Sequence, residues 1–281
     1  MTNFDLLVDG YVAYTFTPQV AAVYLRQLCK INDPRVVQTF SVSGWPGAFF
    51  ITNPPMNHCR PHHIGNNQYA WLLDYAIRPG GTVVPQLLWS PQGQGDWRRY
   101  VQQATLNLPV FFVNADGSLG VPVAYAAAGQ MTLRNAKEPP PLGDKTTTKI
   151  RISVCFFFYT ADAYPLHLPL ISQWPGYPTS EQQVQLRDQT PARNPVTLER
   201  FVKHVGSRVR QYLIVRFFPI VAMTSEIQRF QECERPVNNP YSPWFVGPNG
   251  INFNEVMLIG VVQVSAGSWM PILQLMHRVV M

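Results

Sequence analysis

The sequence predicts a mainly β protein, an antiparallel sandwich or barrel with one or two short helices and long proline-rich loops. Three observations indicate this class. Only 14% of the 281 residues are charged, aromatic residues make up 12%, and the chain contains 26 prolines. About nine to eleven strand-length apolar segments follow one another at short spacing, separated by turns that contain proline and glycine. The sequence lacks the regular alternation of strands with long helices that marks α/β proteins.

The first predicted element is a strand over residues 11–17, which a proline ends. A helix is predicted over residues 19–31, because apolar residues recur at helical spacing and a proline-containing turn follows. Further strands are predicted where short β-branched or aromatic runs lie between turn residues. These strands cover residues 36–42, 48–52, 68–77, 82–89, 110–113, 121–127 and 130–134. Residues 53–67 are expected to form a loop and residues 97–105 a short helix.

The clearest strand is residues 146–160, which is β-branched and aromatic and alternates in its first half before becoming apolar on both faces. A long polar loop is predicted over residues 174–195. The strongest helix is residues 196–212, whose apolar side chains fall on one side of a helical projection. The last predicted strand-like segments are residues 213–223, 255–265 and 269–275.

A chain of 281 residues corresponds to one large domain or two small ones. The sequence favours a β-sandwich core over residues 1–175 and a C-terminal extension over residues 176–281. The extension contains one amphipathic helix and two or three strands, and it can belong to the same sandwich.

The net charge is +6, from 22 Lys and Arg against 16 Asp and Glu, and the basic residues form no terminal arm. Arginine and lysine neutralise phosphates, and aromatic rings stack on exposed bases. The candidates for a basic face that binds nucleic acid or lies in an interface are Arg98, Arg99, Arg200, Lys203 and Arg210. The first two lie between Trp97 and Tyr100, and the others lie on the predicted helix. The alternative interpretation is a solvated helix face and a satisfied arginine pair.

The densest group of metal-capable side chains is His58, Cys59, His62 and His63. Thiolate and imidazole are ligands for zinc. Against a metal site stand Arg60 within the group and the lack of a second ligand cluster at zinc-finger spacing. The alternative is a loop tip whose imidazoles are exposed or meet a neighbouring chain, where they would titrate between about pH 5 and pH 7. No metal ion or cofactor is therefore predicted, and these four residues are the candidates if one binds.

The sequence lacks the short signatures of common enzymes. It has no GxSxG nucleophile turn and no glycine-rich phosphate-binding motif, and its acidic residues are scattered. We therefore do not expect an enzyme. No run of about 18 apolar residues occurs, so no membrane-spanning helix is expected.

One region resembles a known family. Residues 129–135 (GQMTLRN) are predicted as a strand, prolines 139–141 begin a loop, and residues 148–154 (TKIRISV) begin a second strand that runs on to a turn with Asp162. This order resembles the last two strands of the jelly roll in the capsid proteins of picornavirus-like RNA viruses, such as the insect dicistroviruses and iflaviruses.

Residues 45–50 and 68–89 resemble an earlier strand and the middle pair of strands, so the resemblance spans residues 35–172. It implies a jelly-roll β-sandwich and a structural, self-assembling protein, a capsid subunit in the icosahedral shell of a non-enveloped RNA virus. Its partners would be copies of itself and sister capsid subunits, with a weak contact to genomic RNA. The protein would lie in the virion after assembly in the host cytoplasm. The sequence departs from the family in residues 176–281, which exceed a C-terminal tail.

A β-sandwich binding module, lectin-like or membrane-active, is the alternative function. Trp71, Trp89, Trp97 and Tyr100 would then line a sugar or lipid site. The composition favours assembly, because the cores of protein interfaces are poor in Lys, Glu and Asp and rich in aromatic residues and Arg. Most of the 22 basic residues of this chain are arginine.

Overall fold

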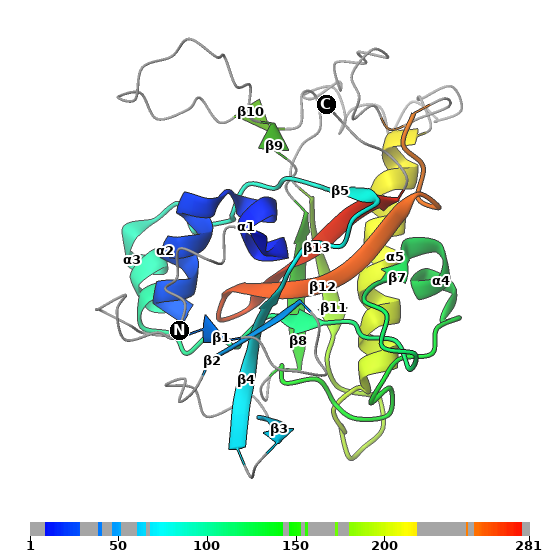
Figure 1. Ribbon diagram of the computed structural model, residues 1–281, viewed down its shortest axis with the longest axis horizontal. Coiled ribbons are helices and arrows are strands. Elements are labelled where there is room, and N and C mark those ends of the chain that lie inside the picture. Colours follow the sequence, from blue (N-terminus) through cyan, green and yellow to red (C-terminus); the bar gives the residue numbers. More distant parts are fainter. Residues whose placement is uncertain are drawn as a thin grey trace.

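A seven-stranded sheet with the hairpin of β12 and β13 at its centre organises the molecule (Figure 1). The structure is a computed structural model. The residues that it describes are 9–28, 39–40, 47–51, 61–65, 68–142, 146–152, 155–156, 172–173, 180–217, 246 and 250–276. The strands of the large sheet run in the order β11-β8-β13-β12-β6, with β5 also paired to β13 and β7 to β12. Their bounds are β5 Gly81–Val83, β6 Val110–Phe111, β7 Val121–Pro122, β8 Thr147–Ile152, β11 Ser180–Gln185, β12 Val256–Ser265 and β13 Ser268–Met276.

A second sheet of four strands has the order β1-β2-β4-β3, and β9 pairs with β10 on its own. The bounds of these strands are β1 Thr39–Phe40, β2 Ala48–Ile51, β3 His62–Gly65, β4 Gln68–Tyr75, β9 Cys155–Phe156 and β10 Ser172–Gln173. The helices are α1 Tyr11–Phe16, α2 Pro18–Leu28, α3 Gln94–Trp97, η3 Arg98–Gln102, α4 Val123–Ala128 and α5 Leu198–Phe217.

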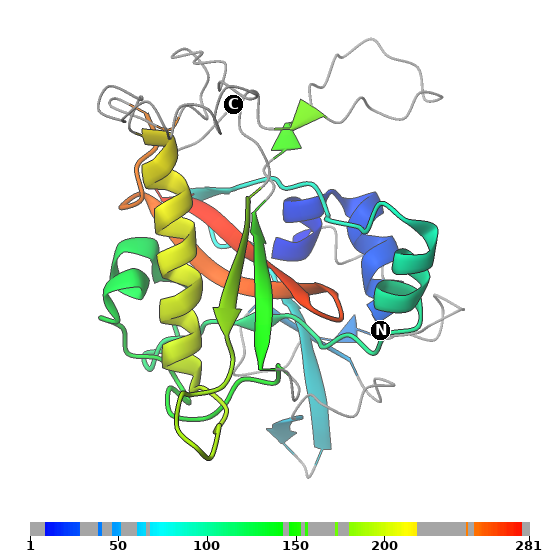
Figure 2. The ribbon, with the colours of Figure 1, turned by 180° about the vertical axis from the view of Figure 1, so that it is seen from behind.

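The central hairpin is buried on both faces. One face packs on a core shared with α4 and α5, and the other packs on α1, α2 and the four-stranded sheet. Figures 1 and 2, which view the molecule from opposite sides, show α5 crossing one face of the large sheet. Along β12, side chains alternate between the two cores, with Leu258 and Val261 on the α5 side and Ile259 and Val262 on the other. A strand covered on both faces needs an almost continuous apolar run, which explains the sequence of this hairpin.

The β-sandwich class is confirmed in its coarser form, because the described residues are mainly β and two sheets share a core. Two details of the prediction are wrong. The pairing of β8 with β13 is parallel, so the large sheet is mixed. The described part of the chain also contains more than one or two short helices, and α5 has 20 residues. The large sheet takes strands from both sides of residue 175, so β11, β12 and β13 share it with strands of the first half of the chain.

The predicted strand over residues 11–17 is wrong, because these residues form α1. Five of the six residues of α1 are buried, so tertiary packing overrides their β propensity. Asp74 of β4 supplies the acceptor that the start of the helix needs: its carboxyl group accepts a hydrogen bond from the backbone N–H of Val12 at 3.1 Å. The predicted helix over residues 19–31 is confirmed as α2 up to Leu28, and its last three residues lie outside the described residues.

The predicted strand over residues 121–127 is also wrong, because the chain forms β7 and then turns into α4. Gly129 ends α4 in the left-handed conformation, with φ of 76°. The following segment, residues 130–134, forms no strand, and only Leu133 makes an isolated bridge, to Asn114. The first of the two strands on which the capsid resemblance depends is therefore missing.

The remaining differences lie at polar or short segments. Residues 62–65 form β3 within the loop predicted over residues 53–67, and residues 180–185 form β11 within another predicted loop. The strand predicted over residues 82–89 ends at Val83. The helix predicted over residues 196–212 is confirmed but continues through Phe217, where the next strand was predicted. The strands over residues 255–265 and 269–275 are confirmed as β12 and β13.

The buried carboxyl of Asp74 makes stability depend on pH. Burial raises the pKa of Asp74 to about 8, against the lowering effect of backbone hydrogen bonds from Tyr75, Val12 and Tyr11. The folded protein therefore keeps a proton that the unfolded chain loses above about pH 4. The stabilising contribution of this proton is fully present below about pH 4, decreases as the pH rises and is lost above about pH 8.

We expect Asp74→Asn to remove this contribution. Urea unfolding at about pH 5 and about pH 8 should show that the free energy of unfolding changes less with pH in the variant than in the wild type. Asp116→Asn is the control, because Asp116 is exposed and hydrogen bonds from Ser118 lower its pKa. If the free energy of unfolding of Asp74→Asn changes with pH as much as that of the wild type, the pH dependence does not come from Asp74.

The crossing of α4 and α5 depends on a glycine. A Cβ atom on Gly206 of α5 would lie 2.6 Å from the Cβ of Ala126 and 2.9 Å from the backbone nitrogen of Ala127. Gly206→Ala should lower the free energy of unfolding by about 1–3 kcal/mol, although alanine favours helix. Gly95→Ala in α3 is the matched control, because a Cβ there would meet no atom within 4 Å. Chemical denaturation of dilute protein measures the free energy of unfolding of both variants. An equal change in the two would refute the close packing of α4 on α5 at Gly206.

Candidate functional site

The structure divides the predicted basic residues between two surfaces. Arg98 and Arg99 lie on η3, whereas Arg200, Lys203 and Arg210 lie together on α5. Figures 1 and 2 place α3, which η3 continues, and α5 at opposite sides of the molecule. The sequence could not show this separation, because it follows from how the two segments pack against the central hairpin.

The first surface, residues 92–100, is exposed at every position. No residue of α3 is buried, and Trp97 and Tyr100 keep 38% and 39% of their surface exposed. The Arg99 guanidinium lies 5.2 Å from the centre of the Tyr100 ring, within the range of a cation–π contact. The segment is nevertheless fixed, because the backbone N–H of Ala266 donates to the carbonyl of Tyr100 at 2.8 Å.

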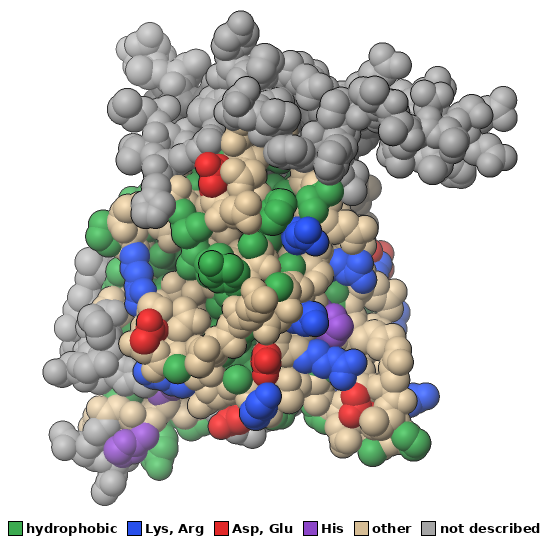
Figure 3. All heavy atoms as spheres, turned by 90° about the vertical axis from the view of Figure 1, so that its right-hand side faces the viewer, with side chains coloured by type: hydrophobic (Ala, Val, Ile, Leu, Met, Phe, Trp, Pro, Cys, Tyr) green, Lys and Arg blue, Asp and Glu red, His purple; other side chains and the backbone are tan. Residues whose placement is uncertain are grey.

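The second surface is the solvent side of α5. Figure 3 looks onto the side of the molecule that carries α4 and α5, and shows Lys and Arg side chains with a His among them. The basic residues are Arg200, Lys203, Arg208 and Arg210, with His204 between them. Among the described residues, no carboxylate forms an ion pair with the four cations. The nearby Glu199 pairs with Lys137 at 3.0 Å. We call this set the α5 basic face.

The electrostatics of His204 reflect this charge. Burial first, and then the positive charges of Arg200, Arg208 and Lys203, lower the pKa of its imidazole. The imidazole is therefore neutral near pH 7, and the positive charge of the face comes from its lysine and arginines.

The predicted histidine and cysteine group is only partly described, since His58 and Cys59 lie outside the described residues. His62 and His63 are consecutive in β3, so their side chains point to opposite faces of the strand. The His62 ring lies 6.0 Å from the ring of Phe50, and the His63 ring 5.5 Å from that of Tyr69. Burial and the charge of Arg134 lower the pKa of His62. The described part of the chain contains no group of three residues that could hold a metal ion.

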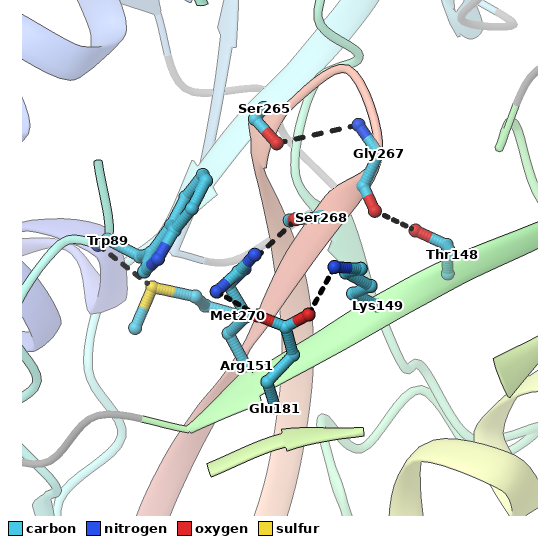
Figure 4. A network of polar contacts seen from close by, with 9 residues as sticks. All are labelled: Trp89, Thr148, Lys149, Arg151, Glu181, Ser265, Gly267, Ser268 and Met270. Atoms are coloured by element: carbon cyan, nitrogen blue, oxygen red, sulfur yellow. Dashed lines mark hydrogen bonds and ion pairs between the residues drawn. The ribbon is translucent and has the colours of Figure 1, made fainter. Parts of the chain in front are cut away.

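A polar network around Arg151 of β8 was missed by the sequence reasoning (Figure 4). The guanidinium of Arg151 forms an ion pair with Glu181 of β11, donates to the hydroxyl of Ser268 at 3.0 Å, and lies 3.6 Å from the centre of the Trp89 ring. Lys149 pairs with the same carboxylate. The network joins β8, β11 and β13, and its contacts are those of a structural link.

The network also bears on the predicted sugar or lipid site. The ring of Trp89 is covered by Arg151, and Trp71 packs on the core beneath the four-stranded sheet. Trp97 and Tyr100 therefore remain as the exposed pair of the four aromatic residues predicted to line such a site.

Comparisons of the chain with protein-family models, with curated protein sequences and with solved structures found no match. Among the described residues, no helix is both long and apolar enough to cross a membrane.

The Arg151 network predicts a difference between two similar glutamates. The side chains of Glu181 and Glu199 are 35% and 33% exposed, but Arg151 is buried whereas the Lys137 side chain is 86% exposed. Glu181→Gln should lower the free energy of unfolding by about 2 kcal/mol, because it leaves a buried guanidinium without its counter-charge. Glu199→Gln should cost less than about 1 kcal/mol. Urea denaturation measures the free energy of unfolding of both variants. An equal decrease in the two would contradict a stabilising role of the Arg151 network.

Proposed function

We propose that the protein is a structural subunit that assembles with copies of itself and with sister subunits through the exposed 92–100 segment. The proposal rests on one observation. The segment holds Trp97 and Tyr100 beside two arginines, and all four residues are exposed. Tryptophan, tyrosine and arginine are the residues that contribute most to the binding energy of protein interfaces.

The segment is also held in place before any partner binds. Val101, the next residue, is buried, and the Tyr100 carbonyl accepts a hydrogen bond from the turn of the central hairpin. A fixed surface loses less conformational entropy on association than a mobile one, which favours binding. The low charge of the chain agrees with a protein whose surface other subunits cover.

The assembly that we infer is the icosahedral shell of a non-enveloped RNA virus, with the protein in the virion. Support comes from the sandwich of two sheets and from the resemblance over residues 35–172, although residues 129–135 lack their expected strand. The jelly-roll topology is part of this proposal. A lectin-like or membrane-active module is the alternative, and Trp97 with Tyr100 would be its contact pair.

The purified full chain should form particles or large oligomers that sedimentation velocity and electron micrographs detect. Trp97→Ala/Tyr100→Ala should raise the protein concentration needed for assembly by at least about tenfold, because it removes two interface anchors. Tyr69→Ala/Tyr125→Ala is the matched control, since these tyrosines are exposed on β4 and α4.

A wild-type protein that stays monomeric at high concentration, over a range of pH and salt, would refute the assembly. Equal loss in both double variants would refute the role of the 92–100 segment. A monomer that binds glycans or liposomes through Trp97 and Tyr100 would establish the alternative function.

A further inference from the structure

We propose that the α5 basic face binds the phosphate backbone of a nucleic acid strand, without reading its bases. The proposal is separate from self-association, because the 92–100 segment lies at the opposite side of the molecule.

The spacing of the side chains makes one continuous surface. At about 100° per residue, Arg200, Lys203, His204, Ser207, Arg208, Arg210 and Gln211 fall within a sector of about 160°. Apolar residues of the same helix, such as Val202, Val205 and Val209, are buried against the sheet. From Arg200 to Arg210 the face extends about 15 Å along the helix axis, a length over which one strand of a duplex presents about four phosphates.

Among the described residues, no carboxylate forms an ion pair with the cations of the face. Arg208 donates to the neutral oxygens of the Gln211 side chain, at 3.1 Å, and the Gln183 backbone, at 3.4 Å. Glu199, the acidic residue of the first turn, is already paired with Lys137. Four cations without carboxylate partners among the described residues attract a polyanion, and counterions released from the phosphates add to the affinity.

The cationic side chains are also supported by neighbouring elements. The guanidinium of Arg210 lies 5.0 Å from the centre of the Phe253 ring. The stem of Lys203 runs beside Gly129 at the end of α4, where an added Cβ would lie 3.3 Å from its Cδ. Both residues remain exposed, and contacts that restrict their side chains reduce the entropy lost when a phosphate binds.

The chemistry of the face favours nucleic acid over an acidic protein. Between the cations lie Ser207, Gln211 and the neutral His204. From Arg200 to Gln211, the described residues of this sector include no exposed large apolar side chain. A specific protein interface needs an apolar centre, whereas a phosphate backbone needs only regularly spaced cations and hydrogen-bond donors.

The test measures binding of the full chain to a fluorescein-labelled oligouridine by fluorescence anisotropy, from about 50 mM to about 200 mM NaCl. For the wild type we expect the affinity to fall with salt, with a slope of log K against log[salt] near −3, as four phosphate contacts on a single strand predict. Arg200→Gln/Arg210→Gln should weaken binding at least about tenfold at about 100 mM salt and bring the slope about 1.4 closer to zero.

Arg26→Gln/Arg78→Gln is the matched control, because it removes the same net charge from exposed residues of α2 and of the turn after β4, outside both the α5 basic face and the 92–100 segment. This variant should keep the affinity and the slope of the wild type. Circular dichroism checks that all variants are folded, and sedimentation of each variant separates loss of binding from loss of assembly.

Three results would overturn the proposal. The first is a wild-type protein whose anisotropy does not change with added oligouridine at low salt. The second is an equal loss of affinity in the two double variants, which would show an effect of net charge alone. The third is poly-glutamate binding as tightly as oligouridine at equal charge, which would assign the face to acidic proteins.

Discussion

The burial of the β12–β13 hairpin on both faces is the constraint on which the rest of the structure depends. Almost every residue of the two strands is buried, so each polar group on them needs a partner. The side chain of Gln274 accepts a hydrogen bond from the Tyr11 hydroxyl at 2.9 Å, and that of Gln263 accepts one from the backbone of Asn107 at 2.6 Å. The Tyr24 hydroxyl donates to the carbonyl of Gln263 at 3.0 Å. These bonds fix α1, α2 and the segment after η3 against the hairpin.

The scarcity of acidic residues explains why positive charge remains on the surface. Several of the described acids serve the structure: Asp74 caps α1, and Glu181 neutralises the cations of β8. Asp116 and Asp188 accept hydrogen bonds in turns, which lowers the pKa of each carboxyl. The cations of α5 are consequently left without partners among the described residues. The helical spacing of α5 gathers four of the basic residues on one face of this helix.

The sequence was sufficient where an element is long and its pattern is repeated, as in α5, β12 and β13. It failed where a distant residue decides the local structure. The six residues of α1 favour a strand by propensity, and Asp74, more than 60 positions away, provides their cap. β11 is polar except for Val184, because only one side of this edge strand meets the core.

α4 had a local signal that was overlooked, namely a run of alanines followed by Gly129. The basic residues of α5 were predictable from helical spacing, but the Arg151 network depends on the register of β8 and β11.

The structure repeatedly places guanidinium groups on aromatic rings. The high content of arginine and aromatic residues is therefore used in specific contacts, two of them on the proposed binding surfaces. Arg151 lies on Trp89 inside the sheet, Arg99 on Tyr100 in the 92–100 segment, and Arg210 on Phe253 beside the α5 basic face. Arg151 uses the ring in addition to its ion pair with Glu181, whereas Arg99 and Arg210 contact a ring face with no acidic partner among the described residues. A lysine ammonium is more strongly hydrated and would cost more to cover. An acid-poor chain rich in arginine and aromatic residues can therefore bury cations between subunits on one side and keep them free for phosphates on the other.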